Sequence, residues 1–172
     1  MRRAGLAVLL AFSLAACKSK KVEVRQTVEE VPRPRSSVHV SDLKASAQLV
    51  NGFYQLESNS WRWTARQFTV ALGPPVGAAQ KGALLKLELT VPQVTIDKLK
   101  TISLTASVGG VDLGPETYAE TGNFTYQREV AASLLGGDTV RVDFRVDKSF
   151  QPGNTDLRDL SIIVSSAALE AK

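Results

Sequence analysis

The sequence predicts an all-β protein, namely an antiparallel β-sandwich of about seven or eight strands with jelly-roll or Greek-key connections. From about residue 45, apolar and polar residues alternate in short runs, which is typical of half-buried strands. Glycine, proline, asparagine and aspartate separate these runs at roughly the spacing of eight to twelve residues expected for a sandwich. No stretch keeps the helical period of about 3.6 residues over three turns.

The first two predicted strands span residues 48–57 and 61–72. Asn51-Gly52 inside the first strand indicates a turn or bulge. In the second strand the apolar parity shifts between Ala65 and Phe68, which predicts a bulge near residues 66–67. Trp63 lies on the apolar parity of the strand, so we expect it in the core of the sandwich. Prolines at 74–75 end the strand because proline cannot donate to the ladder.

The later strands show cleaner alternation. Residues 83–91 place three leucines and Val91 on one face and Lys86, Glu88 and Thr90 on the other. The same pattern recurs in residues 100–108, 123–130, 138–147 and 160–169, and residues 111–113 form a short further segment after a Gly109-Gly110 turn. In residues 138–147 the polar face carries Arg141, Asp143, Arg145 and Asp147, which we expect to be solvated. These segments complete the predicted sandwich.

The N-terminus carries an export signal. Arg2 and Arg3 precede an apolar run of about eleven residues, which suits a signal peptide and is too short for a membrane span. The run ends in Leu-Ala-Ala-Cys17, which closely resembles the bacterial lipoprotein lipobox. The resemblance implies diacylglyceryl transfer to Cys17, cleavage before it and N-acylation. The alternative is an ordinary signal peptide with an incidental Cys17, but the chain has no second cysteine for a disulfide.

The lipidated cysteine predicts attachment to a membrane through several acyl chains. Lys18 stands where, by the enteric sorting rule, an aspartate would favour retention in the inner membrane. We therefore expect a lipid-anchored protein of the bacterial cell envelope, at the outer membrane and associated with the periplasm, with the membrane face left open.

The predicted organisation is a signal peptide (residues 1–16), a lipidated Cys17 with a flexible tether (17–44) and the β-sandwich domain (45–172). Residues 18–35 carry six basic and three acidic residues, whereas residues 36–172 carry thirteen basic and fourteen acidic ones. The formal net charge of +4 therefore belongs to the N-terminal part. Without a concentrated basic face on the folded part, we expect no nucleic-acid binding. His39 is expected to be a solvated residue of the tether.

The residue inventory argues against catalysis. A Ser/His/Asp triad needs a histidine inside the fold, and the only one is His39. No pair of carboxylates stands out, so a hydrolase is a remote alternative that would require two of them in one cleft. One Cys and one His exclude a Cys/His zinc site, and calcium on the loop oxygens of Asn154, Asp156 and Asp159 is a minor alternative. We expect no enzyme activity, no metal and no cofactor.

Two constellations remain: residues 52–57 (GFYQLE) with 61–64 (WRWT), and residues 152–162 (PGNTDLRDLSI). Together they resemble a β-sandwich module that occurs in bacterial envelope proteins and is appended to some glycosyltransferases. The similarity covers about residues 48–170, with Ser161 where such modules often have glycine. It implies a jelly-roll-like fold and a glycan-linked setting, without assigning a binding site.

The candidate site residues fall into two groups. Charged residues of the two constellations are expected to form a structural polar network, because arginine pairs with carboxylates in bidentate geometry: Glu57, Arg62, Asp156 and Arg158. Aromatic residues are the candidates for stacking on a sugar: Tyr54, Trp61, Tyr118 and Phe150. Tyr118 and Phe150 are expected to lie in loops.

The resulting hypothesis is a lipid-anchored envelope protein whose non-catalytic domain binds glycan or peptidoglycan. The alternative is a structural or assembly lipoprotein that docks a protein partner of the envelope through a sheet face or edge strand. An exposed aromatic on a hollowed sheet face would favour the first, and a contiguous apolar patch the second.

Overall fold

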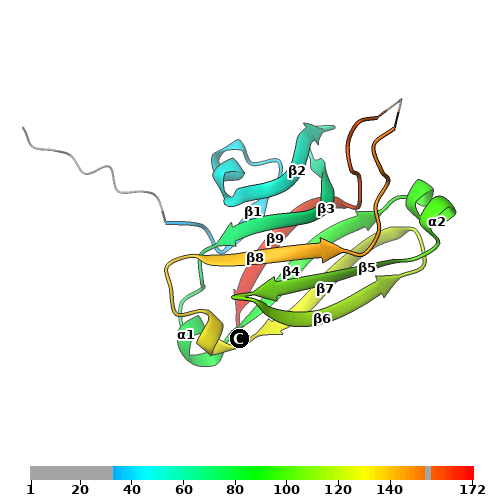
Figure 1. The fold of residues 1–172 in the computed structure, drawn as a ribbon. Helices are drawn as coiled ribbons and strands as arrows, with labels where there is room; N and C mark the ends of the chain where they lie inside the picture. The colour runs from blue at the N-terminus through cyan, green and yellow to red at the C-terminus, as the bar shows by residue number, and fades with distance from the viewer. Residues whose placement is uncertain (1–32, 154–155) are drawn as a thin grey trace, which may run out of the picture. The chain divides into compact units, whose positions relative to one another are not determined.

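The structure, a computed structural model, describes residues 33–153 and 156–172 (Figure 1). This part of the chain contains nine strands and two short α-helices, which confirms the all-β prediction. In chain order they are β1 (Ser37–His39), β2 (Leu49–Glu57), β3 (Trp61–Leu72), α1 (Ala78–Lys81), β4 (Ala83–Val91), α2 (Gln93–Leu99), β5 (Ile102–Val108), β6 (Val111–Tyr118), β7 (Gly122–Val130), β8 (Val140–Val146) and β9 (Ile163–Ala171). Short 3-10 turns at Leu43–Gln48 and Ala132–Leu134 complete the set.

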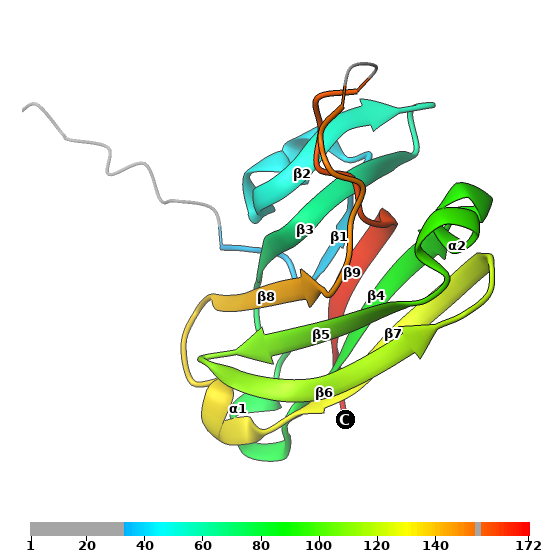
Figure 2. The same cartoon turned by 45° about the vertical axis from the view of Figure 1, so that its right-hand side comes forward.

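All strand pairs are antiparallel and form two layers (Figures 1 and 2). One layer has the order β6-β5-β8-β3-β2, and the other has the order β7-β4-β9-β1. The long strand β3 belongs to both layers, because its residues 67–72 pair with β8 and its residues 62–63 pair with β9. The fold is therefore a sandwich whose layers are joined along β3.

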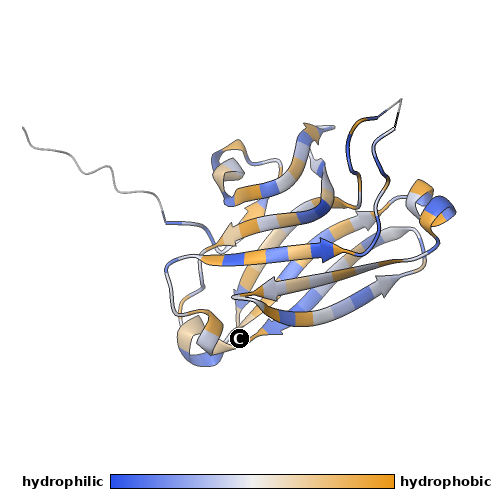
Figure 3. Cartoon of the chain, in the orientation of Figure 1, coloured by the Kyte–Doolittle hydropathy of each residue, from blue (hydrophilic) through white to orange (hydrophobic). Residues whose placement is uncertain are grey.

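The core lies between the layers and follows the predicted alternation. In β4, β5 and β8 every second side chain is buried, and these are apolar. The colouring by hydropathy in Figure 3 shows the alternation of apolar and polar residues along β8. Aromatic rings connect the layers: Phe144 of β8 stacks on Phe68 of β3 and lies 6.4 Å, centroid to centroid, from Tyr126 of β7. Burial of aliphatic and aromatic side chains supplies the main driving force for this arrangement.

Both predicted irregularities of the first hairpin are present. Gly52 has φ +75° and the β2–β3 register shifts around it. Between Thr64 and Thr69, β3 contains more residues than the facing part of β2, as expected for a bulge. C-terminal to the bulge, Phe68, Val70 and Leu72 are buried as predicted.

N-terminal to the bulge, the prediction that Trp63 lies in the core is wrong. Trp63 is only half-buried, whereas its neighbour Thr64 is 0% exposed. Thr64 points inward where β3 passes between the layers, and its hydroxyl donates to the carbonyl of Ile162 at 3.2 Å. The parity of the strand thus turns Trp61 and Trp63 outward.

The predicted boundary of the tether at residue 44 is also wrong. Val38 and Val40 are each 1% exposed, and β1 pairs with β9 from Ser37 to His39. The backbone N–H of Gly73 donates to the carbonyl of Arg35 at 3.0 Å. Charge and prolines suggested a solvated linker, but two alternating valines are enough to place this segment in the sandwich. His39 itself is exposed, as expected.

Some elements differ from expectation in length or kind. The segment predicted at residues 111–113 is the eight-residue strand β6, and β9 begins three residues later than predicted. Helix α2 was not anticipated, because its seven residues are too short to establish a helical period. Among the described residues, no helix is long and apolar enough to cross a membrane. The signal peptide, Cys17 and the first part of the tether lie outside the described residues.

Candidate functional site

Three of the four residues predicted to form a polar network do so. Nη1 of Arg158 lies 2.8 Å from Oε1 of Glu57, and Nη2 lies 2.8 Å from Oδ2 of Asp156. The hydrogen bonds from Arg158 hold the pKa of Asp156 below its usual value. Hydrogen bonds to Asp156 and Glu57 in turn raise the pKa of Arg158. The cluster ties the segment before β9 to the end of β2, which is a structural role.

Arg62, the fourth predicted member, lies outside this network. Its Nε donates to the carbonyl of Val40 at 2.9 Å, and its Nη1 donates to the carbonyl of Tyr54 at 2.8 Å. Arg62 alternates with the two tryptophans along β3, so it points to the opposite side of the strand. It joins the N-terminal segment to the β2–β3 hairpin.

Tyr54 holds the same segment as Arg158. Its hydroxyl donates to the backbone carbonyl of Asp159 at 3.1 Å and accepts from the backbone N–H of Asp159 at 3.0 Å. The guanidinium of Arg158 lies 5.6 Å from the centre of the ring. Because these contacts occupy the side chain, Tyr54 serves to position the segment.

The prediction that Tyr118 binds a ligand is wrong. Its side chain is 4% exposed, and its ring lies 4.8 Å from that of Phe124. Burial raises the pKa of its hydroxyl. The sequence placed Tyr118 in a loop, but the longer β6 carries it into the core.

Phe150 lies beside Trp63. Both line a pocket of about 400 Å³ between α2 and the segment before β9, together with Val94, Lys98 and Arg158. Nζ of Lys98 lies 5.5 Å above the ring of Phe150. Trp61 does not line this pocket, so the predicted aromatics Phe150 and Trp61 do not share one site.

Trp61 borders a larger groove on the outer face of the β7-β4-β9-β1 layer. This groove, which we call the Trp61 groove, has a volume of about 630 Å³. It is lined by polar side chains from five segments and by three apolar residues: His39, Ser60, Trp61, Glu88, Leu89, Thr90, Asn123, Ile163, Ser165 and Ser166. The rings of Trp61 and Trp63 pack edge to face with their centroids 6.5 Å apart, and this contact holds the indole of Trp61 in place.

The polar groups of the Trp61 groove are ordered by cross-strand hydrogen bonds. The hydroxyl of Thr125 donates to both carboxylate oxygens of Glu88 at 3.0 Å. The hydroxyl of Thr90 donates to Oδ1 of Asn123 at 2.6 Å, which leaves the amide N–H groups of Asn123 as donors. The groove thus combines a fixed aromatic surface with oriented donors and acceptors.

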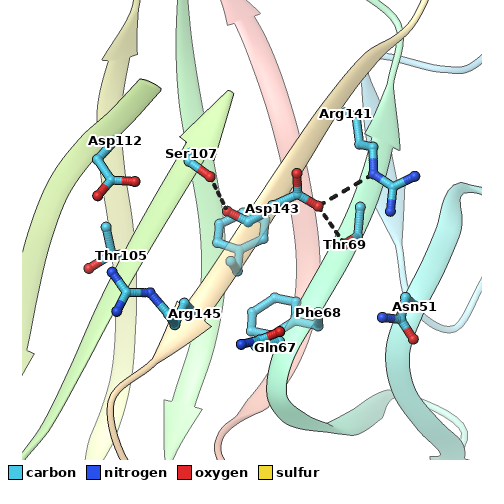
Figure 4. Close-up of a pocket in the computed structure, with 11 residues that line it drawn as sticks. Asn51, Gln67, Phe68, Thr69, Thr105, Ser107, Asp112, Arg141, Asp143 and Arg145 are labelled. Atoms are coloured by element: carbon cyan, nitrogen blue, oxygen red, sulfur yellow. Dashed lines mark hydrogen bonds and ion pairs between the residues drawn. The ribbon is translucent and has the colours of Figure 1, made fainter. Parts of the chain in front are cut away.

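A further hollow lies on the outer face of the other layer, and sequence reasoning missed it (Figure 4). This polar cleft has a volume of about 330 Å³ over β2, β3, β8, β5 and β6. The Arg141, Asp143 and Arg145 alternation of β8 was the available signal. The sequence identified these residues only as the solvated side of a strand.

Within the part of the chain that the structure describes, no three His, Cys, Asp or Glu residues lie close enough together to hold a metal ion. The arrangement offers hydrogen-bonding and stacking surfaces on rigid sheets. Such surfaces suit binding of a hydroxylated ligand.

No protein-family model matches the sequence, and no curated protein matches it. Among solved structures, the chain is similar to one described as "CBM4 structure and function". The TM-score is 0.37 at 9% sequence identity, over 79% of this chain and 85% of that chain. A similarity at this distance assigns no ligand to the chain.

Proposed function

We propose that this protein is a lipid-anchored, non-catalytic protein of the bacterial cell envelope whose β-sandwich domain binds glycan in the Trp61 groove. The observation that carries the proposal is the half-buried indole of Trp61 in the wall of a groove rich in hydroxyl, amide and carboxylate groups. Peptidoglycan and envelope polysaccharides are the glycans that an anchored domain would meet.

The chemistry of the Trp61 groove supports a sugar ligand. A pyranose ring has an apolar face that packs on an aromatic ring and an equatorial belt of hydroxyls that need partners. Trp61 offers the ring, and Glu88 and Asn123 offer an acceptor and a donor at the edge of the same groove. Pockets with an apolar wall and a few oriented polar groups are the usual form of small-ligand sites.

The test is calorimetric titration of the purified full-length protein in detergent with peptidoglycan fragments and envelope polysaccharides. We expect saturable binding, a change in tryptophan fluorescence, and an affinity at least about tenfold lower for Trp61→Ala, since aromatic stacking contributes on the order of 1 kcal/mol or more. Trp61→Phe keeps an aromatic face and should lose less.

Phe150→Ala is the matched control, because it removes an aromatic ring from the neighbouring pocket. It should bind like the wild type. Equal binding by Trp61→Ala and wild type, in a variant with unchanged circular dichroism, would overturn the assignment of the Trp61 groove.

Anchoring at Cys17 is part of the proposal and is supported by the resemblance of the Leu-Ala-Ala-Cys17 segment to the lipobox. We expect Cys17→Ser to accumulate as an uncleaved precursor or to be released from the membrane fraction. Outer-membrane fractions of the wild type should contain the mature, acylated protein by mass spectrometry. Unchanged membrane fractionation of Cys17→Ser would refute lipid anchoring.

The pocket that contains Trp63 and Phe150 favours a second candidate function, docking of a protein partner. Val94 on its rim is 41% exposed and Leu160 adds a further apolar surface. Cross-linking in intact envelopes from a photoreactive residue at position 94 should then capture one specific partner, and Phe150→Ala should abolish the capture.

A further inference from the structure

The polar cleft of Figure 4 lies on the outer face of the β6-β5-β8-β3-β2 layer. Its central strand β8 alternates strictly, with Val140, Val142, Phe144 and Val146 buried and the residues between them exposed. The cleft floor is therefore built from a strand whose inner face is fixed by the core. Such a floor holds its outer side chains at defined spacings.

The strand register places these side chains in rows. In the longer row, each residue lies opposite the next one on the neighbouring strand: Asn51, Thr69, Asp143, Ser107 and Asp112. Four inter-strand spacings of about 4.8 Å give this row a length of roughly 19 Å. The shorter row contains Gln67, Arg145 and Thr105. The rows form an extended surface of hydroxyl, amide and charged groups.

The two arginine side chains of β8 differ in their hydrogen bonds and ion pairs. Nε of Arg141 lies 3.4 Å from Oδ1 of Asp143, which also accepts from the hydroxyl of Thr69 at 2.7 Å. The side chain of Arg145 forms no hydrogen bond or ion pair with the other described residues, although its backbone pairs with β3 and β5. Figure 4 shows its guanidinium extending toward Thr105 over the floor of the cleft. Arg145 therefore presents its donors to a ligand.

We propose that this cleft is a second ligand site, which binds an oligosaccharide carrying carboxylate groups. The guanidinium of Arg145 takes one carboxylate in bidentate geometry. Gln67, Thr105 and Ser107 lie around it and exchange hydrogen bonds with the sugar hydroxyls. Asp112 at the β6 end of the longer row accepts from further hydroxyls.

The charges of the cleft select the ligand class. The side chains of Arg141, Arg145, Asp112 and Asp143 sum to zero charge, so the cleft lacks the net positive surface that a nucleic-acid backbone needs. An acidic oligosaccharide is compatible with this balance where one carboxylate pairs with Arg145 and its other carboxylates extend into solvent. The aromatic rings at the cleft, Phe68 and Phe144, are each 1% exposed, so recognition depends on hydrogen bonds and not on stacking.

The site is independent of the Trp61 groove, which lies on the outer face of the other layer. It extends the proposed function to a second surface and a defined chemical class. Loss of ligand binding at one site does not imply loss of binding at the other, because different residues line the two sites.

The experiment titrates the purified full-length protein in detergent with three probes: an oligogalacturonate, the same oligosaccharide after reduction of its carboxyl groups, and a hexaglutamate peptide. We expect the oligogalacturonate to bind at least tenfold more tightly than either of the others. Arg145→Gln should weaken binding of the oligogalacturonate by about tenfold, the loss typical of a hydrogen bond to a charged group. Thr105→Val, which removes one hydroxyl, should weaken it a few-fold.

Lys98→Gln is the matched control, because it makes the same charge change at the pocket of Phe150, outside this cleft. It should leave oligogalacturonate binding unchanged, as should Trp61→Ala. The proposal is overturned by absence of binding, by equal binding of the reduced oligosaccharide or the peptide, or by an effect of Lys98→Gln as large as that of Arg145→Gln. Loss of oligogalacturonate binding in Trp61→Ala would assign this ligand to the Trp61 groove and overturn the proposal as well.

Discussion

Arg158 is the side chain that fixes the long segment between β8 and β9 against strand β2. Its ion pairs span 101 residues to Glu57 and two residues to Asp156. The backbone N–H of Arg158 also donates to Oδ1 of Asp156 at 2.9 Å. One residue thus closes the segment on itself and attaches it to the sheet, beside the pocket of Trp63 and Phe150.

The carboxylate of Asp156 predicts an acid-sensitive contribution to stability. Its folded-state pKa is lowered from 3.8 by hydrogen bonds from Arg158, so its contribution is present above the unfolded pKa and is lost as pH falls through the folded pKa. We expect Asp156→Asn to be less stable than the wild type at pH 7. The difference should shrink as pH falls below about 4 in urea unfolding.

Asp138→Asn is the control for this experiment, since Asp138 is exposed and makes no ion pair with the other described residues. Its effect should be small at both pH values. A stability difference for Asp156→Asn that stayed constant down to pH 2 would contradict the role of the carboxylate.

At the scale of elements, the seam between β6 and β7 is closed by side chains. These strands end the sheet order, and each would otherwise present an unpaired edge. Arg128 on β7 donates from Nη2 to the carbonyl of Pro115 at 2.6 Å and from Nε to that of Gly114 at 3.3 Å. The hydroxyl of Tyr126 donates to the same Gly114 carbonyl at 2.7 Å.

Arg128 therefore substitutes for a neighbouring strand along part of the β6 edge. We expect Arg128→Met, which keeps a stem over Tyr126 but removes the donors, to lower the free energy of unfolding by about 1–3 kcal/mol. Amide exchange of β6 should become faster than that of β4. Arg141→Met, at an exposed pair, should change stability by less than about 1 kcal/mol, and equal effects of the two variants would contradict this role of Arg128.

At the scale of the whole molecule, the N-terminal segment is a structural part of the sandwich. Val38 and Val40 fill positions in the core. Strand β1 pairs with residues 166–168 of β9, next to residues 163–164, which pair with β3. The folded unit begins near residue 33, so the predicted tether can extend no further than about residue 32.

A chain that begins at Arg33 should fold, whereas a chain that begins at Ala45 should be destabilised by at least about 3 kcal/mol. Each buried valine contributes roughly 1.5 kcal/mol or more, and the backbone pairing of β1 is lost in addition. Urea unfolding of the two truncated chains checks this. Equal stability would place β1 outside the cooperative unit.

Some strands and side-chain environments could be predicted from the sequence, and others could not. The strands β4 and β8 could be predicted because burial of one face imposes a period of two on the sequence itself. The ion pairs of Arg158 were predictable from the charges of two motifs. Trp63 and Tyr118 were assigned to the wrong environments, because a bulge and a strand end decide their side of the sheet, and both depend on neighbouring strands.

The sequence by itself determined the strand class, the core faces of the regular strands and the residue types available for binding. These depend on local alternation and on turn residues, which each segment carries alone. Tertiary structure decided that β3 joins both layers, that Trp61 and Phe150 belong to different hollows, and that Arg145 lies between Gln67 and Thr105. Such neighbours come from segments about forty to eighty residues apart, and only the pairing of strands in the folded sheet brings them together.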